Sequence, residues 1–519
     1  MATATIPIIE GRRQLEQARL DLLKSATERN RLGQFATPPA LATSLAHYAQ
    51  SLVGIDPVRF LDPAIGTGSF FSALSQSFPS NQIQRALGIE IDPLFASIAR
   101  ELWVPEGLRV MEGDFTNQRP EPLYNLVLAN PPYVRHHHLS GPEKERLKIR
   151  LAQSFRLDIS GLAGLYCYFV LLCHEWMEEQ GLAIWLIPSE FMDVNYGAAL
   201  RHYLTEHVTL LHIHRFCPTD VQFKDALVSS AVVVFRKTSP PVGHRIRFSF
   251  AGSIQTPRHE AFVLLDTLRR SRKWTQFPAT TEVMERTGST LGDFFSIKRG
   301  LATGSNSFFI LNEKQIEEWQ IPQEFLKPIL PGPRYVTKDV VEALADGTPD
   351  LSRRLFLLDC SEPEETIKLN WPRFYAYLQT GQNEKIPESY LAGHRMPWYS
   401  QEQRRPAPFL CTYMGRSRNG KHPFRFIWNR STATAHNVYL MLYPKGPLLR
   451  VLQEHPELHS QVFDALKQIT PAQLQSEGRV YGGGLHKVEP KELAQIPAAP
   501  LLESIGSQLQ IEQQGLLFN

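Results

Sequence analysis

The stretch Leu126-Val127-Leu128-Ala129-Asn130-Pro131-Pro132-Tyr133 joins an apolar run to an amide, two prolines and an aromatic ring. A short apolar run of this kind predicts a buried strand, and the Asn-Pro pair after it predicts a turn at the carboxyl end of that strand. Because proline fixes φ, the two prolines hold the turn stiff. The turn is therefore expected to present Asn130 and Tyr133 in a fixed arrangement.

The residue types in this turn suit the methylation of an amino group. An exocyclic amine conjugated to an aromatic base is a poor nucleophile, and it improves when its hydrogens point at acceptors. The side-chain carbonyl of Asn130 and the main-chain carbonyl of Pro131 can be those acceptors, and the Tyr133 ring offers a surface for stacking. The alternative is a plain strand end with an Asn-Pro turn and a half-buried tyrosine.

A strand and a glycine turn lie upstream of this stretch. Val58 to Asp62 is a short predicted strand, followed by the turn Pro63 to Ser69 and an apolar helix. In such a layout a ligand can approach the backbone at the helix N-terminus. The glycine spacing is not that of a dinucleotide site, and no lysine follows as in a P-loop. A purely structural turn is the alternative interpretation.

Two further predicted strands end in acidic residues. The strand Ala86 to Asp92 contains Glu90, which could accept both ribose hydroxyls of an adenosine, although a carboxylate there can also be solvated or cap the next helix. The strand Leu108 to Phe115 brings Asp114, suited to an adenine amino group, and Phe115, suited to packing on the ring. Acidic and glycine-rich turns without phosphate-binding lysines favour a positively charged nucleoside cofactor, and S-adenosylmethionine fits.

Strands that alternate with helices predict an α/β fold with a doubly wound, mostly parallel, Rossmann-like sheet whose ligands lie at the strand carboxyl ends. Near the N-terminus, Leu15, Ala18, Leu22 and Leu23 recur at helical spacing and predict an amphipathic helix. After it, the stretch Gly33 to Pro39 predicts a helix start with Thr37 as its cap.

The order of these motifs resembles that of the gamma-class DNA adenine-N6 methyltransferases of bacterial restriction-modification systems, from roughly Arg31 to Phe235. The segments similar to that family's motifs X, I, II, III and IV are Gly33 to Pro39, Asp62 to Gly68, Glu90 to Asp92, Asp114-Phe115 and Asn130 to Tyr133. The resemblance implies the class I fold of S-adenosylmethionine-dependent methyltransferases.

The resemblance also implies roles for individual residues. It implies cofactor binding by residues of all five motifs: Thr37, Asp62, Ala64, Gly66, Gly68, Glu90, Ile91, Asp114, Phe115 and Pro132. It implies base contacts from Asn130, Pro131 and Tyr133, with Phe223 as a second stacking ring. Asp62 stands where some members have glutamate, so a shorter side chain must reach the methionine amine.

The second half of the chain predicts a separate domain. Composition turns polar near Thr238 to Pro241, directly after the last predicted sheet strand. We therefore expect a catalytic domain over residues 1–240 and an α+β target-recognition domain over 241–519. Within the latter, Phe262 to Arg270 predicts a linking helix, and Leu291 to Leu311 predicts a hairpin or small sheet.

A basic and aromatic stretch runs from Arg395 to Arg430, with eight Arg or Lys against one acid. Such a mixture suits phosphates and base edges, whereas a solvated basic surface is the alternative. A glycine-rich loop from Gly478 to Lys487 resembles loops near the end of recognition domains in the same family. The candidate DNA-binding residues are Arg404, Arg405, Arg416, Arg418, Lys421, Arg425, Arg430 and Lys487.

Composition excludes several other classes of protein. The 519 residues predict two or three domains, and the net charge of +3 is too small to prove a polyanionic partner. Five cysteines without a CxxC pair indicate neither a disulfide framework nor a zinc ribbon. We expect no metal at His136-His137-His138, since three consecutive residues on a regular element cannot all face one ion. No apolar run approaches the roughly 18 residues that span a bilayer.

These observations predict a cytoplasmic, monomeric enzyme that flips adenine out of double-stranded DNA and methylates its N6 from S-adenosylmethionine. No cluster of carboxylates and lysines indicates an attached nuclease, so cleavage would need a separate cognate restriction endonuclease. Two alternatives stay open. An NPPY turn also serves methylation of RNA or of a protein glutamine, and an inert methylase fold can serve as a DNA-binding specificity protein.

Overall fold

The computed structural model describes residues 6–120, 122–155, 157–217, 229–271, 273–278, 288–416, 422–481 and 485–515. It divides into two compact units, Met1–Glu285 with Tyr481–Gly483, and Arg286–Val480 with Gly484–Asn519. This division falls later than the boundary expected near residue 240, because two more strands, ending at Leu264, continue the sheet of the first unit.

Among the described residues, the first unit is built on a nine-stranded sheet with the order β3-β2-β1-β4-β5-β7-β6-β8-β9. Strands β3, β2, β1, β4 and β5 run parallel, and β7 runs antiparallel to both of its neighbours. The doubly wound, mostly parallel sheet is thereby confirmed. The strands are β1 (Val58–Asp62), β2 (Ile83–Glu90), β3 (Leu108–Glu112), β4 (Tyr124–Ala129), β5 (Met177–Pro188), β6 (Thr209–Arg215), β7 (Ser230–Arg236), β8 (Arg245–Gly252) and β9 (Pro257–Leu264).

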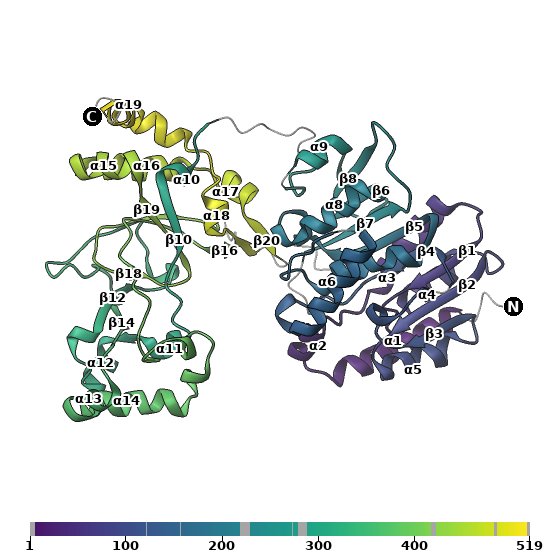
Figure 1. Cartoon of the computed structure of the whole chain (residues 1–519), viewed down its shortest axis with the longest axis horizontal. Coiled ribbons are helices and arrows are strands. Elements are labelled where there is room, and N and C mark those ends of the chain that lie inside the picture. Colours follow the sequence, from purple (N-terminus) through teal and green to yellow (C-terminus); the bar gives the residue numbers. More distant parts are fainter. Residues whose placement is uncertain are drawn as a thin grey trace. The chain divides into compact units, whose positions relative to one another are not determined.

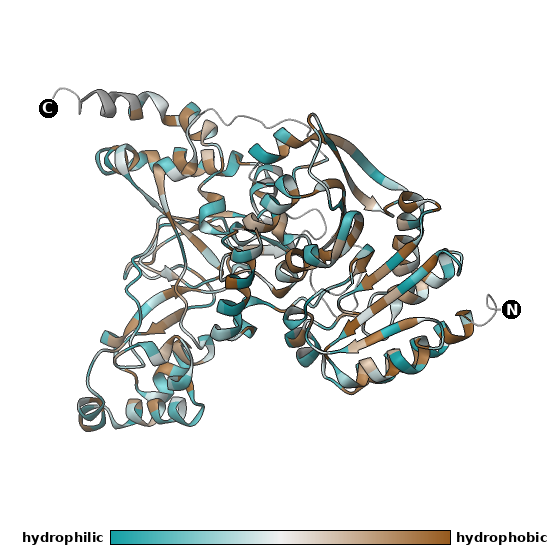
Figure 2. Cartoon of the chain, turned by 45° about the vertical axis from the view of Figure 1, so that its right-hand side comes forward, coloured by the Kyte–Doolittle hydropathy of each residue, from teal (hydrophilic) through white to brown (hydrophobic). Residues whose placement is uncertain are grey.

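Helices flank this sheet (Figure 1). They are α1 (Ile6–Leu22), α2 (Ala26–Leu32), α3 (Pro39–Val53), α4 (Ser69–Ser77), α5 (Pro93–Trp103), α6 (Gly141–Phe155), α7 (Leu165–Cys173), α8 (Ala198–Glu206) and α9 (Leu265–Arg270). Side chains alternate between the two faces of a strand. Phe60 and Leu126 therefore join one core with α3, α4 and α5, whereas Leu61 and Val127 join a second core with α7 and α8. Figure 2 shows hydrophobic residues along the strands and more hydrophilic residues on the outer helix faces.

The strand order reverses at β1, which pairs with β2 on one side and with β4 on the other. At such a switch point the connections leave in opposite directions and open a crevice beyond the strand carboxyl ends. Asp62 ends β1, Glu90 ends β2 and Asn130 directly follows β4. The fold thus gathers three of the predicted site residues at one edge of the sheet.

The N-terminal helix is present, but it buries a different face from the one that its leucines indicate. Leu15 is 73% exposed and Leu22 is 87% exposed, whereas Arg13 and Leu20 are each 2% exposed. The helix packs on α4 and α5 through this second face. The position of buried Arg13 could not be read from the apolar spacing, because that spacing follows the outward face.

The second unit holds two larger sheets, with the orders β10-β19-β15-β17-β13 and β11-β14-β12-β18, and a small sheet in which β16 pairs with β21. Neither the hairpin nor the small sheet expected over 291–311 forms from that segment, since β10 pairs with β19 and β11 with β14, in different sheets. The strands of these sheets are β10 (Phe295–Arg299), β11 (Ile310–Asn312), β12 (Leu326–Leu330), β13 (Val340–Val341), β14 (Leu355–Leu358), β15 (Phe409–Thr412), β16 (Met414–Arg416), β17 (Phe426–Asn429), β18 (Thr434–Ala435), β19 (Tyr439–Pro444), β20 (Arg479–Tyr481) and β21 (Leu485–Lys487).

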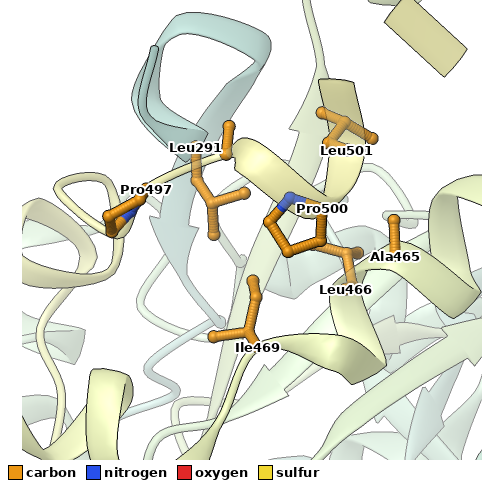
Figure 3. A pocket seen from close by; sticks show the side chains of 8 residues that line it. Leu291, Ala465, Leu466, Ile469, Pro497, Pro500 and Leu501 are labelled. Atoms are coloured by element: carbon orange, nitrogen blue, oxygen red, sulfur yellow. The ribbon is translucent and has the colours of Figure 1, made fainter. Parts of the chain in front are cut away.

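The helices of the second unit cover these sheets. They are α10 (Leu291–Phe294), α11 (Asn306–Phe309), α12 (Glu313–Trp319), α13 (Glu364–Asn370), α14 (Pro372–Asn383), α15 (Gly446–Glu454), α16 (His459–Gln468), α17 (Pro471–Glu477), α18 (Pro490–Leu493) and α19 (Ala499–Gly515). Leu291, Leu466, Ile469 and Leu501 meet around a small cavity lined by aliphatic side chains (Figure 3). Because no polar group lines this cavity, we interpret it as a gap in the packing of the apolar core and not as a ligand site.

Candidate active site

The glycine turn after β1 is pinned on one side and open on the other. Gly66 and Gly68 both have positive φ, +56° and +94°, a conformation that favours glycine. The indole Nε1 of Trp103 donates to the Thr67 carbonyl at 2.8 Å, and a Cβ on Gly68 would lie only 2.3 Å from that nitrogen. A Cβ on Gly66 would meet no atom within 4 Å. The backbone at Gly66 can therefore be approached by a ligand.

Two buried carboxylates flank this turn. Asp62 is 1% exposed, and its Oδ1 accepts from the Ala64 amide at 3.0 Å. Glu90 accepts from the amides of Gly66 and Asp92, both at 2.9 Å. Burial, together with the charge of Glu90, raises the pKa of Asp62 to about 8, although the Ala64 amide acts in the opposite direction. Burial also raises the pKa of Glu90. Two acids placed in this way suit a ligand that brings positive charge and hydroxyl donors.

The side chain of Asn130 is held by the segment that precedes α3. Its Nδ2 donates to the Phe35 carbonyl at 2.8 Å and to Thr37 Oγ1 at 3.2 Å. Its Oδ1 is buried and has no hydrogen-bond partner among the described residues. A buried acceptor without a donor is rare in folded proteins, because it loses its bond to water and gains nothing in return. The amide is thus oriented to receive a donor from a bound molecule.

Tyr133 is more enclosed than the sequence alone indicates. It is 6% exposed, and its hydroxyl donates to the Leu186 carbonyl at 3.1 Å. The centroids of the Tyr133 and Phe35 rings are 5.6 Å apart, at an angle of 47°. Gly33 accepts from the Tyr133 amide at 3.2 Å, and a Cβ on Gly33 would lie 2.4 Å from that nitrogen. The stretch from Gly33 therefore packs directly on the turn that carries Asn130.

These segments enclose one pocket of about 340 Å³, a volume that includes its open mouth. The pocket is lined by Gln17, Phe35, Ala36, Thr37, Asp62, Ala64, Ile65, Gly66, Thr67, Ser69, Phe70 and Asn130. Four of the predicted cofactor residues, Thr37, Asp62, Ala64 and Gly66, thus share a cavity with Asn130. Phe35 and Gln17 were not predicted as site residues. Phe35 could have been, because it lies inside the Gly33 to Pro39 motif, whereas no sequence pattern distinguishes Gln17.

The third acidic turn is engaged with its own backbone. Asp114 Oδ1 accepts from the amide and the hydroxyl of Thr116, both at 2.8 Å, and so caps the short helix Phe115–Asn117. Phe115 is 2% exposed and packs against Phe169 and Trp176 in the core. Neither residue lines the pocket of Asn130. Their predicted contacts with an adenine stay predictions.

The other predicted site residues differ in their surroundings. Ile91 is 64% exposed, Pro131 is buried and Pro132 is half-buried. Phe223, Arg418 and Lys421 lie outside the described residues.

His136–His138 form a single short helical turn, and among the residues that the structure describes no group of three His, Cys, Asp or Glu side chains is arranged to hold a metal ion. In the same part of the chain, every helix is too short or too polar to cross a membrane.

Four of the six predicted DNA-binding cations that the structure describes already have acidic neighbours. The pairs are Arg404 with Glu402 at 2.8 Å, Arg425 with Asp339 at 3.2 Å, Arg430 with Glu342 at 2.9 Å and Lys487 with Glu489 at 2.7 Å. Arg405 and Arg416 are exposed, and neither has an acidic partner among the described residues. The two unpaired arginines are therefore the stronger candidates for contact with phosphate.

Known families match both halves of the chain. A model described as "Eco57I restriction-modification methylase" matches residues 88–222, and one described as "Type II methyltransferase M.Eco57I, C-terminal domain" matches residues 273–516. The Type II methyltransferase M.XamI of Xanthomonas campestris pv. amaranthicola is 28% identical over 92% of this chain and 86% of its own length. The Type II methyltransferase M.AccI of Acinetobacter calcoaceticus is 24% identical over 90% of this chain and 85% of its own length.

The Type IIL restriction-modification enzyme MmeI, solved in complex with DNA, has a similar fold. The TM-score is 0.57 at 13% identity, over 94% of this chain and 76% of that one. The sheet and this likeness identify the fold as that of class I S-adenosylmethionine-dependent methyltransferases, with a C-terminal domain. The cofactor is S-adenosylmethionine, and the pocket fits it, because the open backbone at Gly66 and the buried carboxylates suit a cationic nucleoside. Together the matches make this chain similar to methyltransferases of Type II restriction-modification systems.

Proposed function

We propose that this chain is the modification enzyme of a Type II restriction-modification system and transfers a methyl group to N6 of an adenine flipped out of double-stranded DNA. The observation that carries the proposal is the Oδ1 of Asn130, which is buried and has no hydrogen-bond partner among the described residues, on an amide that Phe35 and Thr37 hold at the wall of the cofactor pocket. An exocyclic amino group is the donor that this acceptor lacks.

Asn130 and Pro131 act on the amine during transfer. Asn130 Oδ1 accepts one N6 hydrogen and the Pro131 carbonyl accepts the other, so electron density on nitrogen rises as the new N–C bond forms. The bonds from Asn130 Nδ2 to Phe35 and Thr37 fix the amide before the substrate arrives, which limits reorganisation in the transition state. S-adenosylmethionine, when bound, supplies an electrophilic methyl group on sulfur. Transfer is direct, with no covalent enzyme intermediate: the methyl–sulfur bond breaks as the N–C bond forms, the sulfur leaves as a neutral thioether, and the methylated nitrogen loses one of its two protons to solvent.

Residues around the glycine turn bind the cofactor. Asp62 binds the methionine amine, and Gly66 lets the ligand lie against the backbone. Glu90 accepts from the Gly66 amide and does not line the pocket, and its binding of the ribose hydroxyls rests on the resemblance alone. Asp114, Phe115, Ile91 and Pro132 complete the predicted set. Tyr133 bounds the base site, but its burial at 6% exposure means that little of its ring is available for stacking, and the predicted second ring is Phe223.

The target is DNA, and the second unit recognises it. Both named relatives that cover most of the chain are Type II methyltransferases. The exposed arginines Arg405 and Arg416, which have no acidic partner among the described residues, offer phosphate contacts. The choice of adenine rests on the resemblance of Asn130 to Tyr133 to motif IV of the adenine-N6 enzymes. We further propose that the enzyme is a cytoplasmic monomer and that a separate endonuclease performs the cleavage.

A labelling experiment tests this function. The protein is incubated with methyl-labelled S-adenosylmethionine and unmethylated genomic DNA, and the DNA is digested to nucleosides. The expected result is label in N6-methyldeoxyadenosine at one sequence context. Label in cytosine would overturn the choice of base. Label only in RNA or protein would favour the other NPPY-type activities, and no label with intact DNA binding would favour an inert specificity protein.

A further inference from the structure

Helix α1 reaches the cofactor pocket, although it lies outside all the motifs that the sequence identifies. Gln17, on this helix, lines the same cavity as Asp62, Gly66 and Asn130. The helix packs on α4 and α5, which follow the first two strands. The glycine turn after β1 thus has a second layer behind it, contributed by a segment that precedes every predicted motif.

A buried arginine joins this helix to the glycine turn. Arg13 is 2% exposed, and its Nη1 donates to Thr67 Oγ1 at 3.0 Å. Its Nε and Nη2 donate to the two carboxylate oxygens of Glu10, both at 2.8 Å. Burial acts to raise the pKa of Glu10, but the hydrogen bonds and charge of Arg13 hold it below its ordinary value. The guanidinium is therefore fixed in orientation by a two-point ion pair on its own helix.

Gln17 completes the connection from the next turn of the helix. The Thr67 hydroxyl donates to Gln17 Oε1 at 2.8 Å, and Gln17 Nε2 donates to Asp21 Oδ1 at 2.9 Å. Thr67 thus accepts from Arg13 and donates to Gln17. With the Trp103 indole on its carbonyl, Thr67 is held on both its side chain and its backbone.

Stability alone gives little reason for this arrangement. Burying Arg13 and partly burying Glu10 removes two charges from water, and a buried ion pair is often no more stable than apolar side chains of similar volume. On a helix whose leucines Leu15 and Leu22 face outward, an apolar residue at position 13 would be the simpler core residue. What the pair does provide is a directed donor at the one hydroxyl between Gly66 and Gly68.

We propose that Arg13 and Gln17 are positioning residues of the cofactor site, which hold Thr67 and thereby keep the Gly66–Gly68 turn in the conformation that receives S-adenosylmethionine. Neither residue has to touch the methyl group that is transferred. The proposal rests on the cofactor assignment, and it extends the proposed function by adding a fourth element, α1, to the site. Because two glycines in left-handed conformations leave the free turn flexible, its order has to come from these contacts.

The test is a titration of S-adenosylmethionine into the full-length protein without DNA, by isothermal calorimetry. Arg13→Met and Thr67→Val each remove one partner of the same hydrogen bond. We expect each to weaken cofactor binding about tenfold, the loss that follows from about 1.4 kcal/mol. The double variant is expected to lose little more than either single variant, because both act on one contact.

Arg19→Met is the matched control, since Arg19 lies on the same helix in an exposed pair with Glu16. It should bind S-adenosylmethionine as the wild type does. Unchanged cofactor affinity in Arg13→Met, or losses that simply add in the double variant, would overturn the proposal. If Arg13→Met fails to fold, then Thr67→Val and Gln17→Leu decide, and wild-type affinity in both would have the same consequence.

Kinetics separate this role from a purely structural one. In the methylation assay, Arg13→Met should raise KM for S-adenosylmethionine about tenfold and change kcat little, since a saturating cofactor restores the order of the turn. A fall in kcat at unchanged KM would contradict the proposal. If the wild type binds cofactor but methylates no DNA, the proposed function fails while the binding comparison still judges the role of α1.

Discussion

The predicted site residues of the two units differ in whether other side chains already bind them. In the first unit, among the described residues, Asn130 Oδ1 is buried without a hydrogen-bond partner, and Asp62 is a buried acid with no basic side chain bonded to it. In the second unit, Arg425 and Arg430, which stand out in the sequence as a basic cluster, are paired with Asp339 and Glu342. The difference teaches that a cluster of charge in sequence includes groups that the fold has already paired, whereas the predicted acceptor of Asn130 is left available to a bound molecule.

The largest expected effect is at the unsatisfied amide. Asn130→Ala removes the acceptor, and we expect kcat to fall about a thousandfold, the loss typical of a donor or acceptor aimed at the transition state. Calorimetry should show S-adenosylmethionine binding nearly unchanged. Normal turnover, measured as N6-methyldeoxyadenosine formed, would remove Asn130 from the mechanism. The unpartnered Oδ1 of Asn130 would then be no sign of a substrate site.

Cofactor binding should also change the ionisation of Asp62. Because burial raises its pKa to about 8, Asp62 is mostly protonated at pH 7 in the free protein, and a bound ammonium favours the ionised form. Binding at pH 7 should therefore release up to one proton, measured by calorimetry in buffers of different ionisation enthalpy. In Asp62→Asn the release should disappear and affinity should fall about tenfold to a hundredfold. Equal proton release in both proteins would contradict the role of Asp62.

A third prediction concerns two buried histidines that are bonded to neighbouring side chains. His212 bonds to Tyr48 and Ser249, and His214 bonds to Ser249 as well. Burial lowers the pKa of His212 to about 3 and that of His214 to about 4. The unfolded chain binds protons below pH 6.5, where the folded state does not, so stability should fall as the pH drops from 7 to 5.

The size of that fall is about 2 kcal/mol for each histidine at pH 5. It can be measured as the free energy of unfolding of the first unit's transition in the full chain, at pH 7 and pH 5. The double variant His212→Gln, His214→Gln should show a flatter dependence even if it is less stable at pH 7. An identical dependence in both proteins would mean that other groups titrate.

The smallest expected effects are those on single cations of the second unit. Arg416→Gln and Arg405→Gln each remove a charge with no acidic partner among the described residues, and each should weaken DNA binding and lower its salt slope by about 1. Arg430→Gln is the matched control, because Arg430 is paired with Glu342. A larger effect at Arg430 than at Arg416 would reverse the ranking of paired and unpaired cations.

Local sequence patterns were sufficient to predict two central strands of the first unit. The predicted strand Val58 to Asp62 has the same bounds as β1, and the run that begins at Leu126 lies within β4. Their side chains are apolar on both faces, as the sheet's two cores require. The prediction of a hairpin or small sheet over 291–311 was wrong, because β10 and β11 do not pair with each other. Each pairs with a strand more than 40 positions away, which local spacing does not indicate.

The sequence by itself determined the chemistry available at the site: an amide before two prolines, acids at strand ends, and glycines where a ligand can approach. Those features depend on residue type and on neighbours along the chain. Only the tertiary structure decided which of them meet. It brought Thr37, Asp62, Gly66 and Asn130 around one pocket, placed Arg13 behind the glycine turn, and paired Arg430 with Glu342. Hydrogen bonds and burial between distant segments depend on how those segments pack, and the local spacing of residues along the chain does not predict that packing.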